Sequence, residues 1–164
     1  MNPRAEFILA SALLAALLQL AVFMALAVLW WNLDPASTFR RALTWLPSPL
    51  FAAGVSAWFT SRLHRRALDR GGFKPFGLAW RTVLLAMLLY PACVAGWLLL
   101  TALADQRWAE NPATLQQTWK IMPTLVMYPA IFAVLLGTAP ALLFEYFVAR
   151  RYLRRGAGKS KSAP

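Results

Sequence analysis

The sequence predicts an all-α integral membrane protein, in which four transmembrane helices form two tandem antiparallel hairpins with both termini in the cytoplasm. Three observations lead to this fold class. Hydrophobic residues make up 60% of the 164 residues and charged residues only 14%, and the mean hydropathy is +0.52. The apolar residues form four long runs, and the lysines and arginines gather between alternate runs. Soluble domains have about 25% charged residues, so this composition argues against an ordinary soluble enzyme or a disordered chain.

The first predicted span covers residues 7–31 and ends in two tryptophans. Its uncharged part, residues 7–29, would be roughly 34 Å long as a helix, which is enough to cross a bilayer with some tilt. A cleaved signal peptide is the alternative, because residues 25–27 have the Ala-x-Ala spacing of a cleavage site. The run is longer than a signal-peptide core, and Glu6 stands where basic residues are expected, so we favour an uncleaved helix.

The other predicted spans cover residues 42–61, 82–104 and 121–149. Proline lacks the N–H donor and clashes with the preceding turn, so prolines inside these spans should kink the helices or delay their start. We treat them as static kinks rather than as hinges of a transport site; they are Pro47, Pro49, Pro91, Pro129 and Pro140. Residues 1–155 then form one four-helix domain, and residues 156–164 are expected to be a disordered cytoplasmic tail.

The orientation follows from the positions of the 17 lysines and arginines. Thirteen of them lie before residue 7, within 62–81 or within 150–161, and four lie within 32–41 or 107–120. Cytoplasmic connections are enriched in lysine and arginine, so both termini and the middle connection are predicted to face the cytoplasm. The two hairpins also end alike, in an aromatic pair followed by arginines, which leaves a tandem duplication open.

Two polar side chains inside the spans, Glu145 and Gln19, form a candidate intramembrane polar site. A charged side chain in hydrocarbon costs roughly 2.5 kcal/mol or more, so such residues often belong to ion paths or proton relays. Glu145 lies only five residues before the basic cluster, and our favoured interpretation is an interfacial ion pair with Arg62, Arg150 or Arg151. The amide of Gln19 should face another helix, because it needs hydrogen-bond partners in a dry environment.

Two further groups of residues suggest contacts outside the chain. Arginines near the predicted cytoplasmic surface are candidate contacts for anionic phospholipid headgroups, although plain anchoring of the topology is the favoured interpretation; they are Arg62, Arg65, Arg66, Arg150 and Arg151. Ala133, Gly137 and Ala141 recur at four-residue spacing and form a helix-packing stripe. That stripe could pack within the bundle or against a partner protein.

No motif in the sequence points to a particular reaction. The single cysteine, Cys93, and the single histidine, His64, have no partners at metal-ligand or catalytic spacing. We therefore expect no metal, no cofactor and no catalytic residue. The basic residues lie beside apolar runs, so we also expect no nucleic-acid binding.

Three classes of function remain, all in a bacterial inner membrane. The favoured class is a non-enzymatic accessory or interaction subunit, which packs against a larger membrane protein or against itself. The second is a small transporter or channel that works as an oligomer, and the third is a lipid-directed membrane enzyme. Polar residues converging on a cavity would favour the second class over the first.

Overall fold

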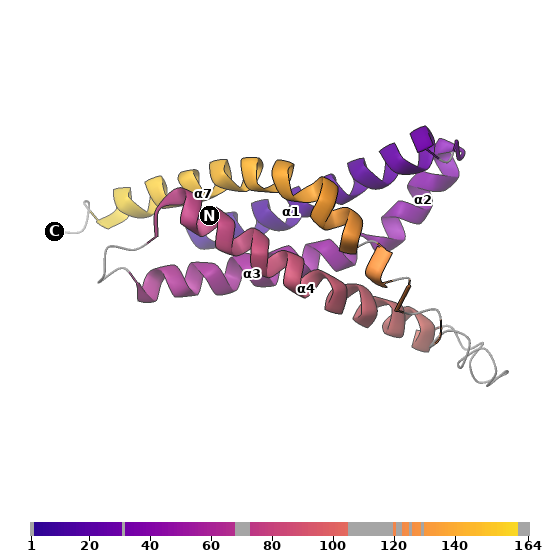
Figure 1. Ribbon diagram of the computed structural model, residues 1–164. Coiled ribbons are helices and arrows are strands. Elements are labelled where there is room, and N and C mark those ends of the chain that lie inside the picture. Colours follow the sequence, from indigo (N-terminus) through magenta and orange to yellow (C-terminus); the bar gives the residue numbers. More distant parts are fainter. Residues whose placement is uncertain are drawn as a thin grey trace.

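The computed structural model describes residues 2–30, 32–67, 73–104, 120, 123–124, 126–128 and 130–160. Within these residues every regular element is a helix, which confirms the all-helical prediction (Figure 1). The elements in chain order are α1 (Pro3–Ala25), its π-helical continuation η1 (Leu26–Trp30), α2 (Pro35–Trp45), α3 (Pro47–Arg66), α4 (Pro75–Ala104), the π-helical segment η3 (Ala133–Gly137) and α7 (Thr138–Ser160).

Three helical stretches are long and apolar enough to cross a membrane, namely Pro3–Leu29, Pro75–Ala102 and Val126–Arg155. Large apolar side chains point out of the bundle along all three, as in Leu17, Leu88 and Leu135, which are 64%, 74% and 71% exposed. An outward leucine is stable in lipid, since the acyl chains are as apolar as the side chain. The chain is therefore compatible with a multi-pass membrane protein.

The region of the second predicted span, residues 42–61, is divided between two helices. Helix α2 ends at Trp45 and α3 begins at Pro47, so the helical hydrogen-bonding pattern is interrupted around Leu46. Pro47 and Pro49 occupy the first turn of α3, where a missing N–H costs little because first-turn donors have no partner within the helix. These two prolines thus begin a helix rather than bend one.

Helix α3 packs against both α1 and α4, and α7 packs against α4 and α1, so the four long helices form a ring. Helix α3 is the most enclosed of them, with nine buried residues against three in α1. Its buried face carries hydroxyl groups, and Thr60 Oγ1 lies 2.9 Å from Thr82 Oγ1 of α4. Because α3 is sheltered, it can be more polar than its neighbours and still be stable.

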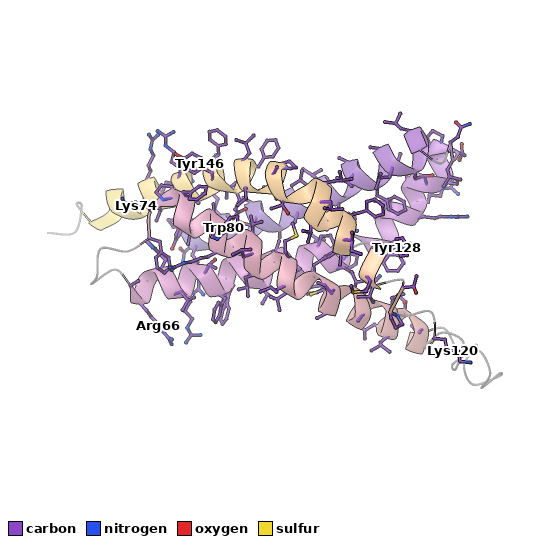
Figure 2. The ribbon with its side chains drawn as sticks, in the orientation of Figure 1. Arg66, Lys74, Trp80, Lys120, Tyr128 and Tyr146 are labelled. Carbon is purple, nitrogen blue, oxygen red and sulfur yellow. The ribbon has the colours of Figure 1, made fainter. Side chains whose placement is uncertain are left out.

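One end of the bundle, which we call the closed end, joins the start of α1, the end of α3, the start of α4 and the end of α7. Glu6 forms an ion pair with Arg151 at 2.9 Å and a second pair with Arg155. Arg4 Nε donates to Ser61 Oγ at 3.1 Å. Figure 2 shows Arg66 and Lys74 at this end and Lys120 at the opposite end.

His64 fixes the connection between α3 and α4 at the closed end. Its Nδ1 accepts a hydrogen bond from the backbone N–H of Phe73 at 3.0 Å, and the side chain is 7% exposed. Burial lowers the pKa of His64, because the charged imidazolium would lose its hydration. A neutral ring is also the form that can accept from a backbone donor, so His64 has a structural role.

The hydrophobic core lies just inside the closed end. Phe7, Ala57, Leu78 and Ala149 are each at most 1% exposed, and the Phe7 ring stacks on Tyr152 with the ring centres 4.9 Å apart. Helices α3, α4 and α7 each contribute an alanine to this core, so their backbones approach closely; the residues are Ala57, Ala79 and Ala149.

The last helix changes its winding before Pro140. Segment η3 is π-helical over Ala133–Gly137, and Pro140 follows it by three residues. Pro140 cannot donate to the carbonyl of Leu136, and a π-helical turn is a common way to accommodate such a lost bond. Helix α4, in contrast, remains one continuous helix through Pro91. Pro129 lies outside the described residues.

Helix α7 continues to Ser160, so residues 156–160 are helical where the composition predicts a disordered tail. Arg151 and Arg155 lie one turn apart on α7 and both contact Glu6, which holds the start of this extension against α1.

Candidate functional site: a cavity between the four long helices

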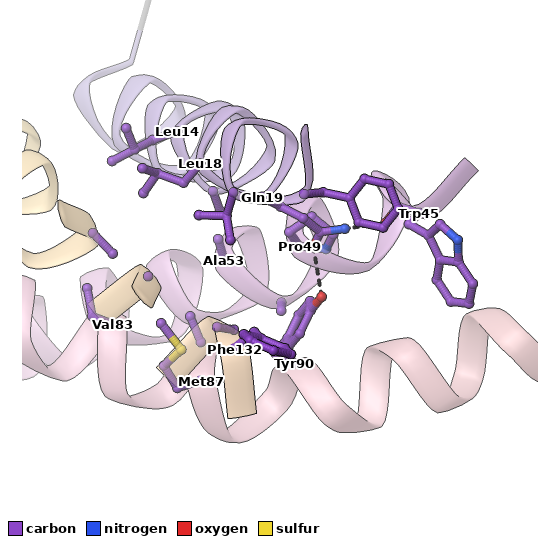
Figure 3. Close-up of a pocket in the computed structure, with 18 of the residues that line it drawn as sticks. Leu14, Leu18, Gln19, Trp45, Pro49, Ala53, Val83, Met87, Tyr90 and Phe132 are labelled. Carbon is purple, nitrogen blue, oxygen red and sulfur yellow. Dashed lines mark hydrogen bonds between the residues drawn. The ribbon is translucent and has the colours of Figure 1, made fainter. Parts of the chain in front are cut away.

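A cavity of about 480 Å³ lies in the middle of the ring, beyond the closed end (Figure 3). This volume falls within the range of about 300–1,000 Å³ that is typical of small-molecule pockets. Every long helix contributes to its wall, for example through Leu18 of α1, Ala53 of α3, Met87 of α4 and Ala141 of α7. Trp45 at the end of α2 and Tyr128 before η3 line it farther from the closed end.

The wall is mainly aliphatic and aromatic, with few polar side chains. Small residues provide much of the room, because at these positions no side chain fills the space between the helices; those lining the cavity include Ala15, Ala52, Ala53, Ala86, Ala133, Gly137 and Ala141. The predicted stripe of Ala133, Gly137 and Ala141 therefore faces the inside of the bundle. A Cβ added to Gly137 would lie 3.8 Å from Met87 Cε of α4, which is ordinary contact.

Gln19 connects three helices at the side of the cavity. Its Oε1 accepts from the Tyr90 hydroxyl at 2.9 Å, and its Nε2 donates to the carbonyl of Trp45 in a long bond of 3.4 Å (Figure 3). The usual helical donor to the Trp45 carbonyl would be the backbone N–H four residues later, but that residue is Pro49. The Gln19 amide thus supplies a hydrogen bond that the proline cannot make.

The same interruption exposes a second carbonyl, which is satisfied from α4. Trp97 Nε1 donates to the carbonyl of Thr44 at 2.7 Å. Together, Gln19 and Trp97 hold the junction of α2 and α3 between α1 and α4. These two bonds supply donors to carbonyls that the break leaves without their usual helical partners, which helps to stabilise the junction.

Glu145 lies at the end of the cavity nearest the closed end. It is 3% exposed, and its Oε1 lies 2.7 Å from Ser11 Oγ of α1. The interfacial ion pair favoured from the sequence is not the contact observed: Arg151 pairs with Glu6 instead, and the Arg62 guanidinium lies over the Trp58 ring, 5.4 Å from its centre. Helical spacing explains the difference, because Glu145 and Arg150 are five residues apart and so point to different sides of α7.

The remaining candidate lipid contacts are solvent-accessible. Arg65, Arg66 and Arg150 are exposed near the closed end, where an anionic surface could reach them. The structure brings together the two polar residues and the small-residue stripe around one cavity, whereas these arginines lie outside it. Arg4, which the sequence did not single out, contacts both Ser61 and the Trp58 ring.

Sequence reasoning missed the contributions of Ser11, Thr82 and Tyr90 to the cavity. Single hydroxyl groups in an apolar run carry little signal, because they can bond to their own helix, as Ser11 also does with the Phe7 carbonyl at 2.9 Å. The four-residue spacing of Ser11 from Ala15 and of Ala15 from Gln19 is the available signal, since it puts these residues on one helix face.

No protein-family model, curated protein or solved structure matches this chain. The function therefore has to be argued from the cavity itself.

Proposed function

We propose that the chain crosses the bacterial inner membrane four times, as two tandem antiparallel hairpins with both termini in the cytoplasm. Helix α3 would cross the membrane in addition to the three apolar helical stretches and would be the second span along the chain. Its 20 residues extend over roughly 30 Å, and it is sheltered by α1 and α4. The orientation rests on the excess of lysine and arginine beside the closed end.

We propose further that the protein is a small membrane transporter whose substrate occupies the central cavity. The observation that carries this proposal is a cavity of about 480 Å³ inside a single copy, lined by all four long helices and by the buried carboxyl group of Glu145. Protein interiors are close-packed with few voids, and an ionisable side chain within a membrane is costly, so a space of this size beside Glu145 indicates a functional site. The π-helical segment η3 borders the cavity, and such segments often occur at functional sites.

This proposal replaces the accessory role as the favoured function. One of the supports for the accessory role was a small-residue stripe that could pack against a partner, whereas Ala133, Gly137 and Ala141 line the cavity. Because one copy brings lining residues from all four long helices together, we expect substrate binding without the oligomer expected for a transporter of this size.

The topology can be tested with single cysteines in a Cys93→Ala background. A membrane-impermeant maleimide added to spheroplasts should label a cysteine at Ser37, in the predicted exported connection. Cysteines at Lys74 and Arg154 should be labelled only after the membrane is broken. Labelling of Ser37 and Lys74 from the same side would contradict the four-span arrangement, because α3 lies between these two positions.

Substrate binding in the cavity can be tested by photolabelling with a small neutral aromatic diazirine. In the wild-type protein the probe should label Leu18 and Met87, which line the cavity, as well as the lipid-facing Leu88. Ala86→Phe should reduce labelling of Leu18 by at least half and leave Leu88 unchanged, because the new ring fills the cavity.

The matched control is Ala92→Phe, which adds the same ring to the exposed side of α4. It should leave the labelling of Leu18 and Met87 unchanged. If Leu18 and Met87 are not labelled in the wild type, or are labelled equally in Ala86→Phe, the cavity does not admit small molecules and the proposed function is wrong.

A further inference from the structure

Among the described residues that line the cavity, Glu145 is the one whose side chain can carry a full charge near neutral pH. None of the described lining residues is a lysine, arginine, histidine or aspartate, and the other titratable groups among them are the phenols of Tyr90 and Tyr128. Any ionic attraction exerted by the wall on a ligand is therefore exerted on a cation.

The protein does not neutralise Glu145 with a cation of its own in the part of the chain that the structure describes. The ion pairs there join Glu6 to Arg151 and Arg155, outside the cavity. Glu145 is nevertheless 3% exposed. An isolated buried carboxylate is so unfavourable that it takes up a proton unless a cation is bound beside it.

The contacts of Ser11 indicate where that proton lies when the cavity is empty. Ser11 Oγ is 2.9 Å from the carbonyl oxygen of Phe7 and 2.7 Å from Glu145 Oε1, and a hydroxyl has a single proton to donate. Both contacts are full hydrogen bonds if Ser11 donates to Phe7 while a protonated Glu145 donates to Ser11 Oγ. The geometry thus suits a neutral carboxylic acid.

We propose that the cavity binds a lipophilic organic cation, which displaces the proton of Glu145 and pairs with its carboxylate. This inference rests on the proposed function and names the class of its substrate. One proton leaves for each monovalent cation that enters, so the net charge of the buried site stays at zero. Ser11 then turns its hydroxyl proton to the carboxylate.

The remainder of the wall suits the apolar body of such a ligand. Leu18, Val83 and Met87 provide aliphatic contacts, and Phe132 provides an aromatic face for a cation or a ring. The other polar pair, Gln19 and Tyr90, already forms hydrogen bonds within the wall, with each other and with the Trp45 carbonyl. The body of the ligand therefore needs few hydrogen-bonding groups.

The helices packed around Glu145 also carry charged or titratable groups, which lie outside the cavity wall. The nearest along each helix are Arg4 and Glu6 of α1, Arg62 and His64 of α3, Arg81 of α4, and Tyr146, Arg150, Arg151 and Tyr152 of α7. Glu6 is paired with arginines and Arg81 lies over the Phe73 ring, 3.9 Å from its centre. If replacing Glu145 alone removes the pH dependence of binding, that dependence comes from Glu145 and not from these other groups.

The experiment measures the binding of tetraphenylphosphonium to the purified protein in detergent, by equilibrium dialysis between pH 5 and pH 9. Tetraphenylborate, of the same shape and opposite charge, is the ligand control. While Glu145 is protonated, the affinity for the phosphonium should rise about tenfold per pH unit, as the exchange of one proton requires. Tetraphenylborate should show no binding that depends on Glu145.

Glu145→Gln should lower the affinity for tetraphenylphosphonium at least tenfold at high pH and abolish the pH dependence. Glu145→Asp, which keeps the carboxylate, should retain the pH dependence. The matched control is Glu6→Gln, which removes a carboxylate outside the cavity and should bind like the wild type. Wild-type affinity that does not change with pH would overturn the proposal even if Glu145→Gln fails to fold.

Failure of this inference can be separated from failure of the proposed function. If the neutral diazirine labels the cavity but tetraphenylphosphonium binds equally well to Glu145→Gln, the protein has a cavity for neutral molecules and the cation inference is wrong. If the diazirine also fails to reach Leu18, both proposals are wrong.

Discussion

Alanines line both the closed end and the cavity, but the helices pack tightly at the closed end and leave open space at the cavity. At the closed end, Ala57, Ala79 and Ala149 are fully buried and the helices touch. Around the cavity, Ala15, Ala86 and Ala133 are half-buried and border open space. Figure 1 shows α1 and α4 spreading apart toward the end opposite the two termini. A small residue permits close packing only where the helix axes converge, and where they diverge it creates room.

Polar contacts differ between the two regions in the same way. At the closed end they join charged or neutral groups at the rim, such as Glu6 with Arg151 and Phe73 with His64. In the cavity they lie within the wall, as with Ser11 and Glu145. The first set fixes the helix ends, whereas the second leaves a carboxyl group beside space that a ligand can enter.

The largest expected effect comes from adding the same side chain to each region. Ala57→Leu should destabilise the protein by about 3 kcal/mol, because a fully buried position cannot accommodate the extra atoms without separating the helices. In a chain of this length, that corresponds to a fall in Tm of roughly 6–12 °C. The measurement is thermal unfolding in detergent, followed by circular dichroism.

Ala86→Leu is the matched substitution in the cavity. It should leave Tm unchanged or raise it, since the new side chain fills space beside Met87. Equal losses of stability in the two variants would show that the cavity closes in the folded protein and would end the comparison between the regions.

A smaller effect is expected from removing a ring at the closed end. Phe7→Ala should cost roughly 2 kcal/mol, less than the 3–5 kcal/mol of a water-soluble core, because detergent solvates the released apolar surface. Leu17→Ala on the same helix, where the side chain is 64% exposed, should change stability by less than about 0.5 kcal/mol. The same thermal unfolding assay measures both variants, and similar losses would place Phe7 outside the core.

The smallest effect concerns the hydrogen bond between Gln19 and Tyr90. A double-mutant cycle with Gln19→Leu and Tyr90→Phe should give a coupling free energy of about 0.6 kcal/mol, the average for hydrogen bonds between membrane helices. Chemical denaturation in mixed micelles measures this coupling. Strict additivity of the two variants would mean that the bond adds no stability at the cavity wall.

Composition and hydropathy are sufficient to predict an all-helical protein with apolar spans, because lipid requires each segment to satisfy its own backbone hydrogen bonds. Pro47 and Pro49 likewise indicate where a helix has to begin. The polarity of α3 shows the limit of this reasoning. Its serines and threonines lower its hydropathy, and only the ring of neighbours shows that they are sheltered.

The cavity could not be predicted from the sequence, because it results from the divergence of helices rather than from any motif. Glu145 illustrates the point. Its nearness to Arg150 in sequence favoured an ion pair, whereas its direction from α7 places it against Ser11 of a helix 134 residues earlier. Side-chain direction depends on the rotation of α7, and the mixed apolar pattern of that helix does not specify it.

The hydrogen bond from Gln19 to the Trp45 carbonyl makes two distant positions interdependent. A backbone donor would return with Pro49→Ala, and the Nε2 donor of Gln19 would then no longer be needed by the Trp45 carbonyl. Loss of Gln19 should therefore be more harmful beside a proline than beside an alanine, where only its bond with Tyr90 is lost. A genetic screen for second-site suppressors of Gln19→Leu would be expected to recover changes at codon 49, an epistasis set by one missing N–H.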